Sequence, residues 1–238
     1  MPLYNDQAVV LRNWKLGEAD KIISLYGVEH GKIRAVAKGV RKTKTKFGAR
    51  LEPISYLKIQ CWEGSSELHI VSQVESIELF PRIKSDLELL RKGLAIVEVI
   101  EELIGDSTGD IEIFKLLVRA LDTLERRDSP YLLSGFLWRL LQVEGVSPEL
   151  SCCVECGEPE GLEFFSNSGS GLVCSSHGSA KRISKGAIEV ISYISQGEVA
   201  RALALGDSPV RLEVEELAIS QVENLISHKV KALHLGSY

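Results

Sequence analysis

The chain has 238 residues, of which 45% are hydrophobic and 26% charged, and its formal net charge is −5. This length allows one large domain or two small ones, and the composition is typical of a packed globular protein. Intrinsic disorder, collagen-like repeats and coiled coil are thereby excluded for most of the chain. A net charge of −5 argues against nucleic-acid binding only if the charge is evenly spread.

The N-terminus, residues 1–6, has no basic region followed by an apolar segment, so we expect no secretory signal. No apolar run approaches the roughly 20 residues of a membrane-spanning helix. We therefore expect a soluble, cytoplasmic protein with no membrane partner. In a reducing cytosol, clustered cysteines are more often metal ligands or redox thiols than structural disulfides.

The first 80 residues are predicted to be rich in β-strands. Residues 32–38 alternate sharply, with Ile33, Ala35 and Ala37 on the face opposite to Lys32 and Arg34. The expected strands are Ala8–Leu11, Asp20–Tyr26, Lys32–Lys38, Ile54–Trp62 and Glu67–Val74. Five short strands separated by turns predict a small barrel, either an oligonucleotide-binding (OB) barrel or a Src-homology-3-like barrel.

The hydrophobic period changes to that of a helix near Pro81. The expected helices are Asp86–Ile104, Ile111–Glu125, Tyr131–Val143, Ser184–Ile194 and a last one after Ser208-Pro209 through Ile226. A loop-rich segment at 151–180 interrupts them. We therefore predict two domains, a small β-barrel at 1–80 and an all-α helical domain at 81–238 that the segment 151–180 interrupts.

The charge is unevenly divided between these two parts. Residues 1–80 carry a net charge of +3 and residues 81–238 carry −8. One loop between predicted strands holds six basic residues and no acidic one: Lys38, Arg41, Lys42, Lys44, Lys46 and Arg50. Such a cluster attracts phosphate backbones through counterion release. The alternative is a solvated loop that only aids solubility.

Two further residues extend the predicted DNA-binding surface of the barrel. Phe47 lies within the basic loop, where an aromatic ring can stack on a base of a single strand. Arg34 lies on the preceding strand and extends the basic patch. Trp14 and Trp62 also lie in predicted strands, but we expect them in the barrel core rather than on bases.

Three cysteines and a histidine have the spacing of a zinc site. Cys153-x2-Cys156 is followed after 17 residues by Cys174-x2-His177. Each pair spans a tight turn, and four such ligands satisfy the tetrahedral preference of structural zinc. A redox pair, a catalytic zinc and a nucleophilic Cys–His pair are weaker alternatives, since no supporting motif accompanies them. Cys152 is an alternative ligand to Cys153, although the two-residue spacing favours Cys153.

Other residues carry less information about function. Trp138 is expected in the helical core, and Arg139, inside the same apolar helix, is either an ion-paired core residue or a partner-binding group. The remaining histidines have no partner at ligand spacing. No phosphate-binding glycine loop, Gly-x-Ser-x-Gly or His-Glu-x-x-His motif is present, so an enzyme is not indicated.

Two segments carry a resemblance to a known family. They are 37–53, around Ala-Lys-Gly-Val-Arg and Phe-Gly-Ala-Arg-Leu-Glu-Pro, and 140–157, which runs into the first cysteine pair. Together with the order of barrel, helices and zinc insert, they resemble the RecO family of bacterial DNA repair proteins. His177 stands where a fourth cysteine often stands in that family.

The resemblance implies a recombination mediator with an N-terminal OB-fold barrel, here 1–80, and a helical C-terminal domain, here 81–238, into which a zinc-binding segment at 151–180 is inserted. Such a protein binds single- and double-stranded DNA, anneals complementary strands and works with RecR. It contacts the tail of single-stranded DNA-binding protein and helps load RecA on coated strands. Its zinc is expected to be structural, and its location cytoplasmic, with the nucleoid.

The partner tail is acidic and ends in phenylalanine, so the resemblance implies an apolar groove with a basic rim. Arg126, Arg127 and Arg139 are the candidates for that rim. Two other function classes remain open: a zinc-containing nucleic-acid-processing enzyme and an RNA-binding OB protein. Strand scission would identify the first, and a preference for RNA over DNA the second. The sequence leaves open the oligomeric state, the preference between single and double strands, and the surface that meets RecR.

Overall fold

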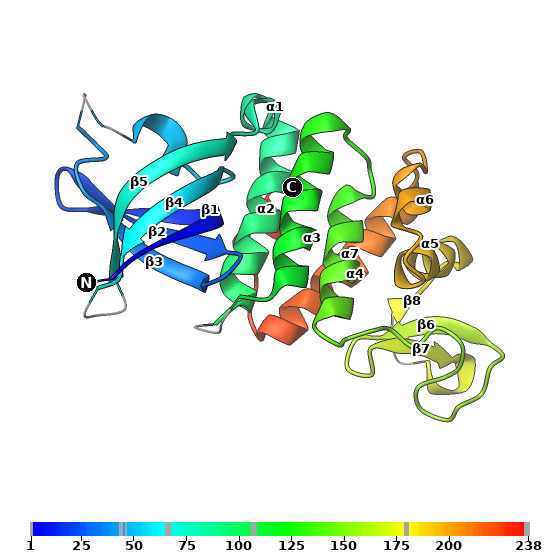
Figure 1. The fold of residues 1–238 in the computed structure, drawn as a ribbon. Helices are drawn as coiled ribbons and strands as arrows, with labels where there is room; N and C mark the ends of the chain where they lie inside the picture. The colour runs from blue at the N-terminus through cyan, green and yellow to red at the C-terminus, as the bar shows by residue number, and fades with distance from the viewer. Residues whose placement is uncertain are drawn as a thin grey trace. The chain divides into compact units, whose positions relative to one another are not determined.

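The chain forms two compact units in the computed structural model (Figure 1). The residues that the structure describes are 2–42, 45, 47–64, 68–105, 109–178 and 181–235. The first unit comprises Met1–Arg127 and Val230–Tyr238, and the second Asp128–Lys229. The domain boundary at residue 80 stays a prediction, because the first unit also contains helices that follow the barrel. No helix in the described part of the chain combines the length and apolar character of a membrane span.

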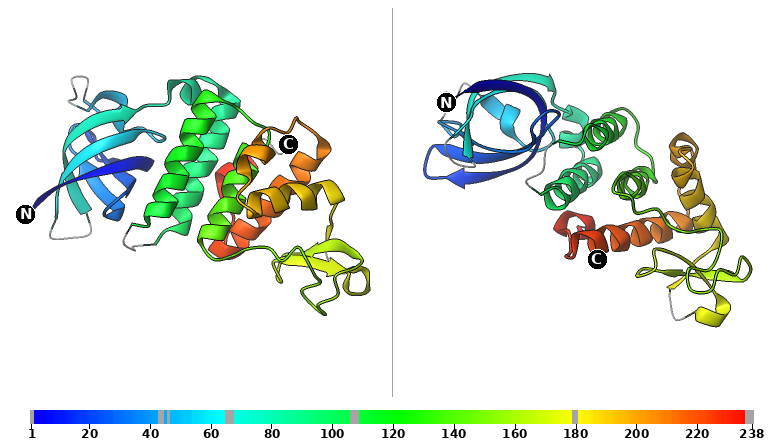
Figure 2. Two further views of the ribbon diagram at one scale, coloured as in Figure 1. Left: turned by 45° about the vertical axis from the view of Figure 1, so that its right-hand side comes forward. Right: turned by 60° about the horizontal axis from the view of Figure 1, so that its bottom comes forward.

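Five strands of the first unit close into a barrel. They are β1 (Leu3–Leu16), β2 (Asp20–Gly27), β3 (Gly31–Ala37), β4 (Tyr56–Trp62) and β5 (Leu68–Glu78). Their order around the barrel is β1-β2-β3-β5-β4, and β3 pairs with β5 in parallel while the other pairs are antiparallel. The predicted OB-fold barrel is thereby confirmed, and Figure 2 shows its closed cross-section.

The barrel core follows the alternation of the strands. In β3, Ile33, Ala35 and Ala37 are buried, while the positions between them are exposed or half-buried, as the sequence pattern predicts. The loop after β3 also contributes to the core. Phe47 and Leu51, at a short 3₁₀ turn η1 (Gly48–Leu51), are each 1% exposed and belong to the same hydrophobic cluster as Ile33.

Asp6 on β1 fixes the turn between β2 and β3. Its carboxylate accepts hydrogen bonds from the backbone N–H groups of Gln7 (2.7 Å) and His30 (3.0 Å), and lies 2.9 Å from His30 Nδ1. The hydroxyl of Tyr4 lies 2.9 Å from His69 Nδ1, and burial lowers the pKa of His69, which favours the neutral ring as acceptor. These histidines, to which the sequence assigned no chemistry, therefore order the end of the barrel.

Among the described residues of the first unit, three helices follow the barrel. They are α1 (Pro81–Ser85), α2 (Leu87–Leu103) and α3 (Ile111–Arg126), with a 3₁₀ turn η3 (Lys231–His234) from the C-terminus. The side chain of Asp86 caps α2 by accepting from two backbone N–H groups, and Asp110 caps α3 in the same way. The helices α2 and α3 lie side by side in both figures.

In the described part of the second unit there are four helices and a small sheet. The helices are α4 (Leu132–Val143), α5 (Lys185–Ser195), α6 (Val199–Leu203) and α7 (Pro209–Ile226). The predicted helical core is confirmed at Trp138, which is 1% exposed and donates from its indole N–H to the carbonyl of Val214. The sheet has the order β7-β6-β8 and is built from β6 (Leu162–Ser166), β7 (Gly171–Cys174) and β8 (Lys181–Arg182). The sequence had indicated only loops there.

Candidate metal centre and nucleic-acid interface

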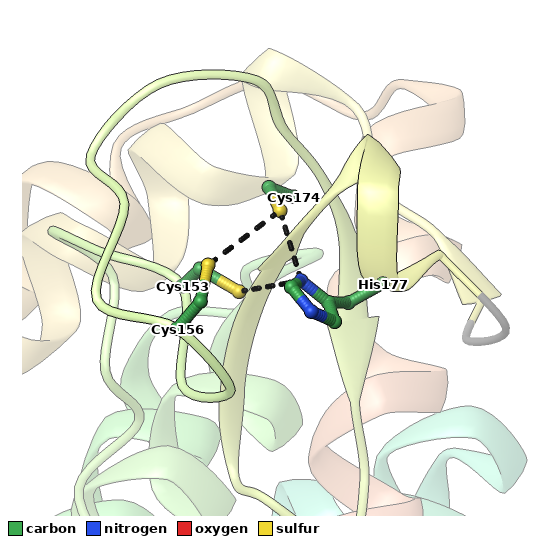
Figure 3. A group of neighbouring side chains, drawn as sticks. All are labelled: Cys153, Cys156, Cys174 and His177. Carbon is green, nitrogen blue, oxygen red and sulfur yellow. Dashed lines mark hydrogen bonds between the residues drawn. The ribbon is translucent and has the colours of Figure 1, made fainter.

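Four potential metal ligands meet at one end of the small sheet (Figure 3). Cys153 and Cys156 lie on a tight turn before β6, Cys174 ends β7, and His177 lies on the following 3₁₀ turn, η2 (Ser175–His177). One ligand atom from each of the four lies within 4.8 Å of the others. The spacing of the two pairs in the sequence therefore predicted a real spatial cluster.

Several separations between these atoms are close to those around a tetrahedral metal ion. The sulfur atoms of Cys156 and Cys174 lie 3.9 Å apart, and His177 Nδ1 lies 3.2 Å from Cys174 Sγ and 3.9 Å from Cys153 Sγ. A zinc ion bound tetrahedrally to sulfur and nitrogen would place its ligands about 3.5–3.8 Å apart. The group could bind a metal ion, and Cys152, which is half-buried, is not part of it.

The local backbone affects how readily the cysteines ionise. Burial by itself raises the pKa of the Cys153 thiol, but hydrogen bonds to backbone groups of Cys174, Glu155 and Cys156 outweigh burial and lower it. The pKa of Cys174 is lowered in the same way, against burial, by backbone hydrogen bonds of Ser176 and by the neighbouring thiols. A backbone hydrogen bond of Glu158 lowers the pKa of Cys156, but burial and the neighbouring thiols of Cys153 and Cys174 outweigh it, so that this pKa is raised instead. Thiolate is the form that binds a metal, so the backbone contacts of Cys153 and Cys174 favour ligation.

The sheet that carries these ligands is attached to the helices of its unit. Phe165 on β6 packs edge-on against Trp138 of α4, with 6.1 Å between ring centroids. Gln221 of α7, only 3% exposed, accepts from Ser170 Oγ (2.7 Å) and donates to the carbonyl of Asn167 (3.0 Å). The ligand turns therefore extend from a fixed base, which is what a preformed metal site requires.

The described basic residues of the loop after β3 are accessible. Lys38, Arg41 and Lys42 are exposed, and Arg41 donates to the carbonyl of Gly17 (2.9 Å), which fixes its position. Arg50 is half-buried and donates to the carbonyl of Phe47. The predicted residues Lys44 and Lys46 lie outside the described part of the chain. Arg34 is exposed on the outward face of β3. A role of these residues in DNA binding stays a prediction.

Three aromatic residues of the barrel have the reverse of their predicted exposure. Base stacking by Phe47 is wrong for this structure, because the ring lies in the barrel core. Core positions for Trp62 and Trp14 are also wrong: Trp62 is 40% exposed, and Trp14 is half-buried on the outward face beside Arg12. Strand parity decides this difference, since the strand neighbour of Trp62, Cys61, is the residue that points inward.

The three candidate arginines of the partner groove do not lie in one unit. Arg126 ends α3 and pairs with Asp122 at 2.8 Å, and Arg127 follows it, both in the first unit. Arg139 lies in α4 of the second unit, where it donates to Gln142 Oε1. Their role as the rim of one groove stays a prediction.

Comparison with known proteins gives the family. A family model for the N-terminal part of recombination protein O matches residues 1–80, and one for its C-terminal part matches residues 84–234. Among curated relatives, proteins named DNA repair protein RecO are 41% identical in Cutibacterium acnes and 42% identical in Streptomyces avermitilis. Each match covers 73% of this chain and 74% of the relative. With nearly all of its length matched in this way, the chain belongs to the RecO family.

Proposed function

We propose that this protein is a DNA-binding recombination mediator that acts in DNA repair. The observation that carries the proposal is the exposed basic group of Lys38, Arg41 and Lys42 on a barrel of the OB fold, in a member of the RecO family. This fold commonly binds oligonucleotides, and clustered lysine and arginine bind phosphates without regard to sequence. The relatives named DNA repair protein RecO support the same role.

The proposed activity is annealing of complementary strands. Two single strands repel one another through their phosphates, and a basic surface that neutralises part of this charge lowers the repulsion. No covalent step is needed, because base pairing itself supplies the driving force once the strands are close. The protein therefore acts as a binding protein and not as an enzyme.

The proposal includes the partners that the family resemblance implies. The protein works with RecR and helps load RecA on strands coated by single-stranded DNA-binding protein, whose acidic tail it contacts. Residues 81–238 carry a net charge of −8 and therefore attract DNA less than the barrel does. Their surface is better suited to binding protein partners. Both strand forms of DNA are bound, and the protein acts in the cytoplasm at the nucleoid.

The proposed metal is a structural Zn²⁺ held by Cys153, Cys156, Cys174 and His177. Three cysteines and one histidine are a common structural set, and four protein ligands leave no position for a reacting water. The ion would cross-link the turn before β6 to the end of β7. In this way the ion would stabilise the small sheet that carries its ligands.

A strand-annealing assay tests the proposed function. Fluorescent complementary strands, bare or coated with single-stranded DNA-binding protein, are mixed with the intact protein, and duplex formation is followed over time. We expect faster duplex formation without cleavage or nucleotide consumption. Replacing Lys38, Arg41 and Lys42 together by alanine should slow annealing and lower the slope of log affinity against log salt by about 2.

A matched variant controls for the lost charge. Lys185, Lys229 and Lys231 are also exposed and lie outside the barrel, so their replacement by alanine removes the same three charges elsewhere. This control should anneal like the unchanged protein. Strand scission would instead identify a nucleic-acid-processing enzyme, and stronger binding of RNA than DNA would identify an RNA-binding protein. Equal loss in both triple variants would contradict the role of the loop.

A further inference from the structure

A row of apolar side chains crosses the outward face of the barrel. Its members are cross-strand partners from one strand to the next: Trp14 opposite Ile22, Ile22 opposite Val36, Val36 opposite Ile70, and Ile70 opposite Trp62. Cross-strand partners share a face and lie about 5 Å apart. Their neighbours along the strands, such as Ile23 and Val71, are buried in the barrel core. These five residues, here called the apolar row, therefore point outward.

The apolar row is more exposed than the adjacent part of the same barrel face, which contacts helix α2. Ser24, two residues after Ile22, is completely buried, and its hydroxyl donates to Oε2 of Glu101 on helix α2 at 2.5 Å. In contrast, Trp62 is 40% exposed and the other four members are half-buried. Leu3, opposite Trp62, is 43% exposed and extends the row. A barrel face of this kind, with the exposed indole ring of Trp62 and the half-buried ring of Trp14, is suited to a flat apolar ligand.

Basic residues border the apolar row on the same face. Arg34 is two residues before Val36, and Lys38 two residues after it; both are exposed and have no ion pair among the described residues. The guanidinium of Arg12 lies 5.2 Å above the ring of Trp14, and its Nη1 also pairs with Oε1 of Glu102 at 3.7 Å, so its charge is partly neutralised. The nearby carboxylate of Asp20 accepts from the backbone N–H of Gly39 and is engaged there. The row itself contains no acidic side chain.

Flat apolar rings bordered by cations match the chemistry of one ligand, an unpaired polynucleotide strand. Base faces are apolar and stack on aromatic rings, while the phosphates between them need positive charge. In a duplex the base faces already stack on one another, so only the phosphates remain available. A strand crossing five β-strands at their usual spacing would follow about 19 Å of surface, enough for several nucleotides.

We propose that the apolar row is the surface on which this protein stacks the bases of single-stranded DNA, with Arg34 and Lys38 holding the phosphates beside it. The inference rests on the proposed DNA-binding function and deepens it. The basic loop binds the phosphates of either strand form, whereas the apolar row contributes only when bases are unpaired. The row therefore gives the protein a preference for single strands.

Fluorescence anisotropy with two probes of equal length, a labelled oligothymidine and a labelled duplex, tests the proposal. Trp14→Ala and Trp62→Ala should each weaken oligothymidine binding about tenfold. Duplex affinity should change less than twofold, and the salt slope for either probe should stay unchanged because no charge is lost. Trp62→Phe keeps an aromatic face and should retain most of the affinity. Leu87→Ala, which truncates an 83% exposed side chain of α2, is the control.

The outcomes separate the two proposals. Unchanged oligothymidine binding by both tryptophan variants overturns the stacking surface but leaves DNA binding by the basic loop intact. Equal losses of affinity for both probes also overturn it, because duplex bases are not available for stacking and the loss of a stacking surface should not weaken duplex binding. Failure of the unchanged protein to bind either probe overturns the proposed function itself. Circular dichroism melting of each variant identifies a loss of folding. If an alanine variant unfolds, Trp62→Gln removes the ring from this 40% exposed position and should show the same loss of oligothymidine binding.

Discussion

The ammonium of Lys32 lies 3.3 Å from Oε1 of Glu101, and the two side chains are only 7% and 6% exposed. Lys32 also donates to the carbonyls of Glu101 (2.6 Å) and Ile104 (3.1 Å) at the end of α2, while Ser24 donates to Oε2 of Glu101. A cation at the C-terminal end of a helix satisfies carbonyls that have no partner within the helix. The pair thus joins strand β3 to helix α2.

Removing one member of this pair should destabilise the first unit strongly. Lys32→Met leaves the Glu101 carboxylate buried without its partner, and we expect a loss of about 3–5 kcal/mol in the free energy of unfolding. The double variant Lys32→Met/Glu101→Leu should recover much of that loss, because neither charge remains. Urea titration followed by circular dichroism measures both. As a control, Lys115→Ala removes an exposed pair with Glu112 and should cost less than about 1 kcal/mol.

Phe47 should be required for stability and not for contact with DNA. Its ring is 1% exposed in the barrel core, so Phe47→Ala should lower the free energy of unfolding by about 3–5 kcal/mol. Phe47→Leu keeps an apolar side chain of similar size and should bind oligothymidine like the unchanged protein. Anisotropy and urea titration provide the two measurements. A folded Phe47→Leu variant with tenfold weaker binding would show that the ring contacts bases after all.

The directions of Phe47 and Trp62, both predicted wrongly, show which side-chain orientations a sequence pattern can and cannot predict. Alternation within Lys32–Lys38 predicted the inward face of β3 correctly, because a regular strand has a fixed period of two. Phe47 follows no regular period, since it lies in a loop that turns back into the core. Its burial depends on tertiary packing that no local pattern encodes. The direction of Trp62 depends on the register of β4, which a one-residue shift would reverse.

In the second unit, too, some features could be predicted from the sequence and others could not. The cysteine spacing alone predicted which four side chains gather, because two ligand pairs on tight turns leave few other arrangements. Its long helices α4, α5 and α7 were predicted from their apolar period and caps to within a residue or two at most ends, whereas the five-residue helix α6 was not predicted. The sheet of β6, β7 and β8 was missed, since its strands are two to five residues long and too short for an alternation to be recognised.

Loss of one ligand should abolish metal binding, whereas loss of the adjacent thiol should not. Purified protein should contain about one equivalent of zinc by atomic absorption, and Cys153→Ser should contain less than about a fifth of that. Cys152→Ser is the matched control, because Cys152 lies outside the ligand group and the variant should retain its zinc. The reverse result for the two variants would assign the ligand role to Cys152.

Chelation should destabilise the second unit in particular. The two ligand pairs lie on separate segments of the chain, so an ion that binds both would contribute directly to folding. Prolonged treatment with a strong chelator should lower the melting temperature and increase amide hydrogen exchange in β6 and β7. The barrel strands should retain their protection. Unchanged exchange in β7 after complete metal removal would contradict a structural role for the ion.

Gly171 should be intolerant of any side chain. A Cβ atom at this position would lie 2.7 Å from the carbonyl oxygen of Glu149 and 2.7 Å from Cγ1 of Val154. The first of these atoms is backbone and cannot rotate away, and the same carbonyl accepts a hydrogen bond from the N–H of Leu172. Gly171→Ala must therefore displace the segment before the first cysteine pair. We expect a loss of about 1–3 kcal/mol in stability and faster release of metal to a chelator.

Gly206→Ala is the matched control for this substitution. Gly206 lies in the same unit, and a Cβ there would meet no atom within 4 Å among the described residues. Its backbone also does not require a positive φ, so alanine should be neutral or slightly stabilising through the unfolded chain. Thermal melting and the rate of metal transfer to a chromogenic chelator compare the two variants. If the two variants have the same melting temperature and rate of metal transfer, the backbone at Glu149 can move to accommodate a methyl group. The close contact at Gly171 would then not be what holds the ligand turn in place.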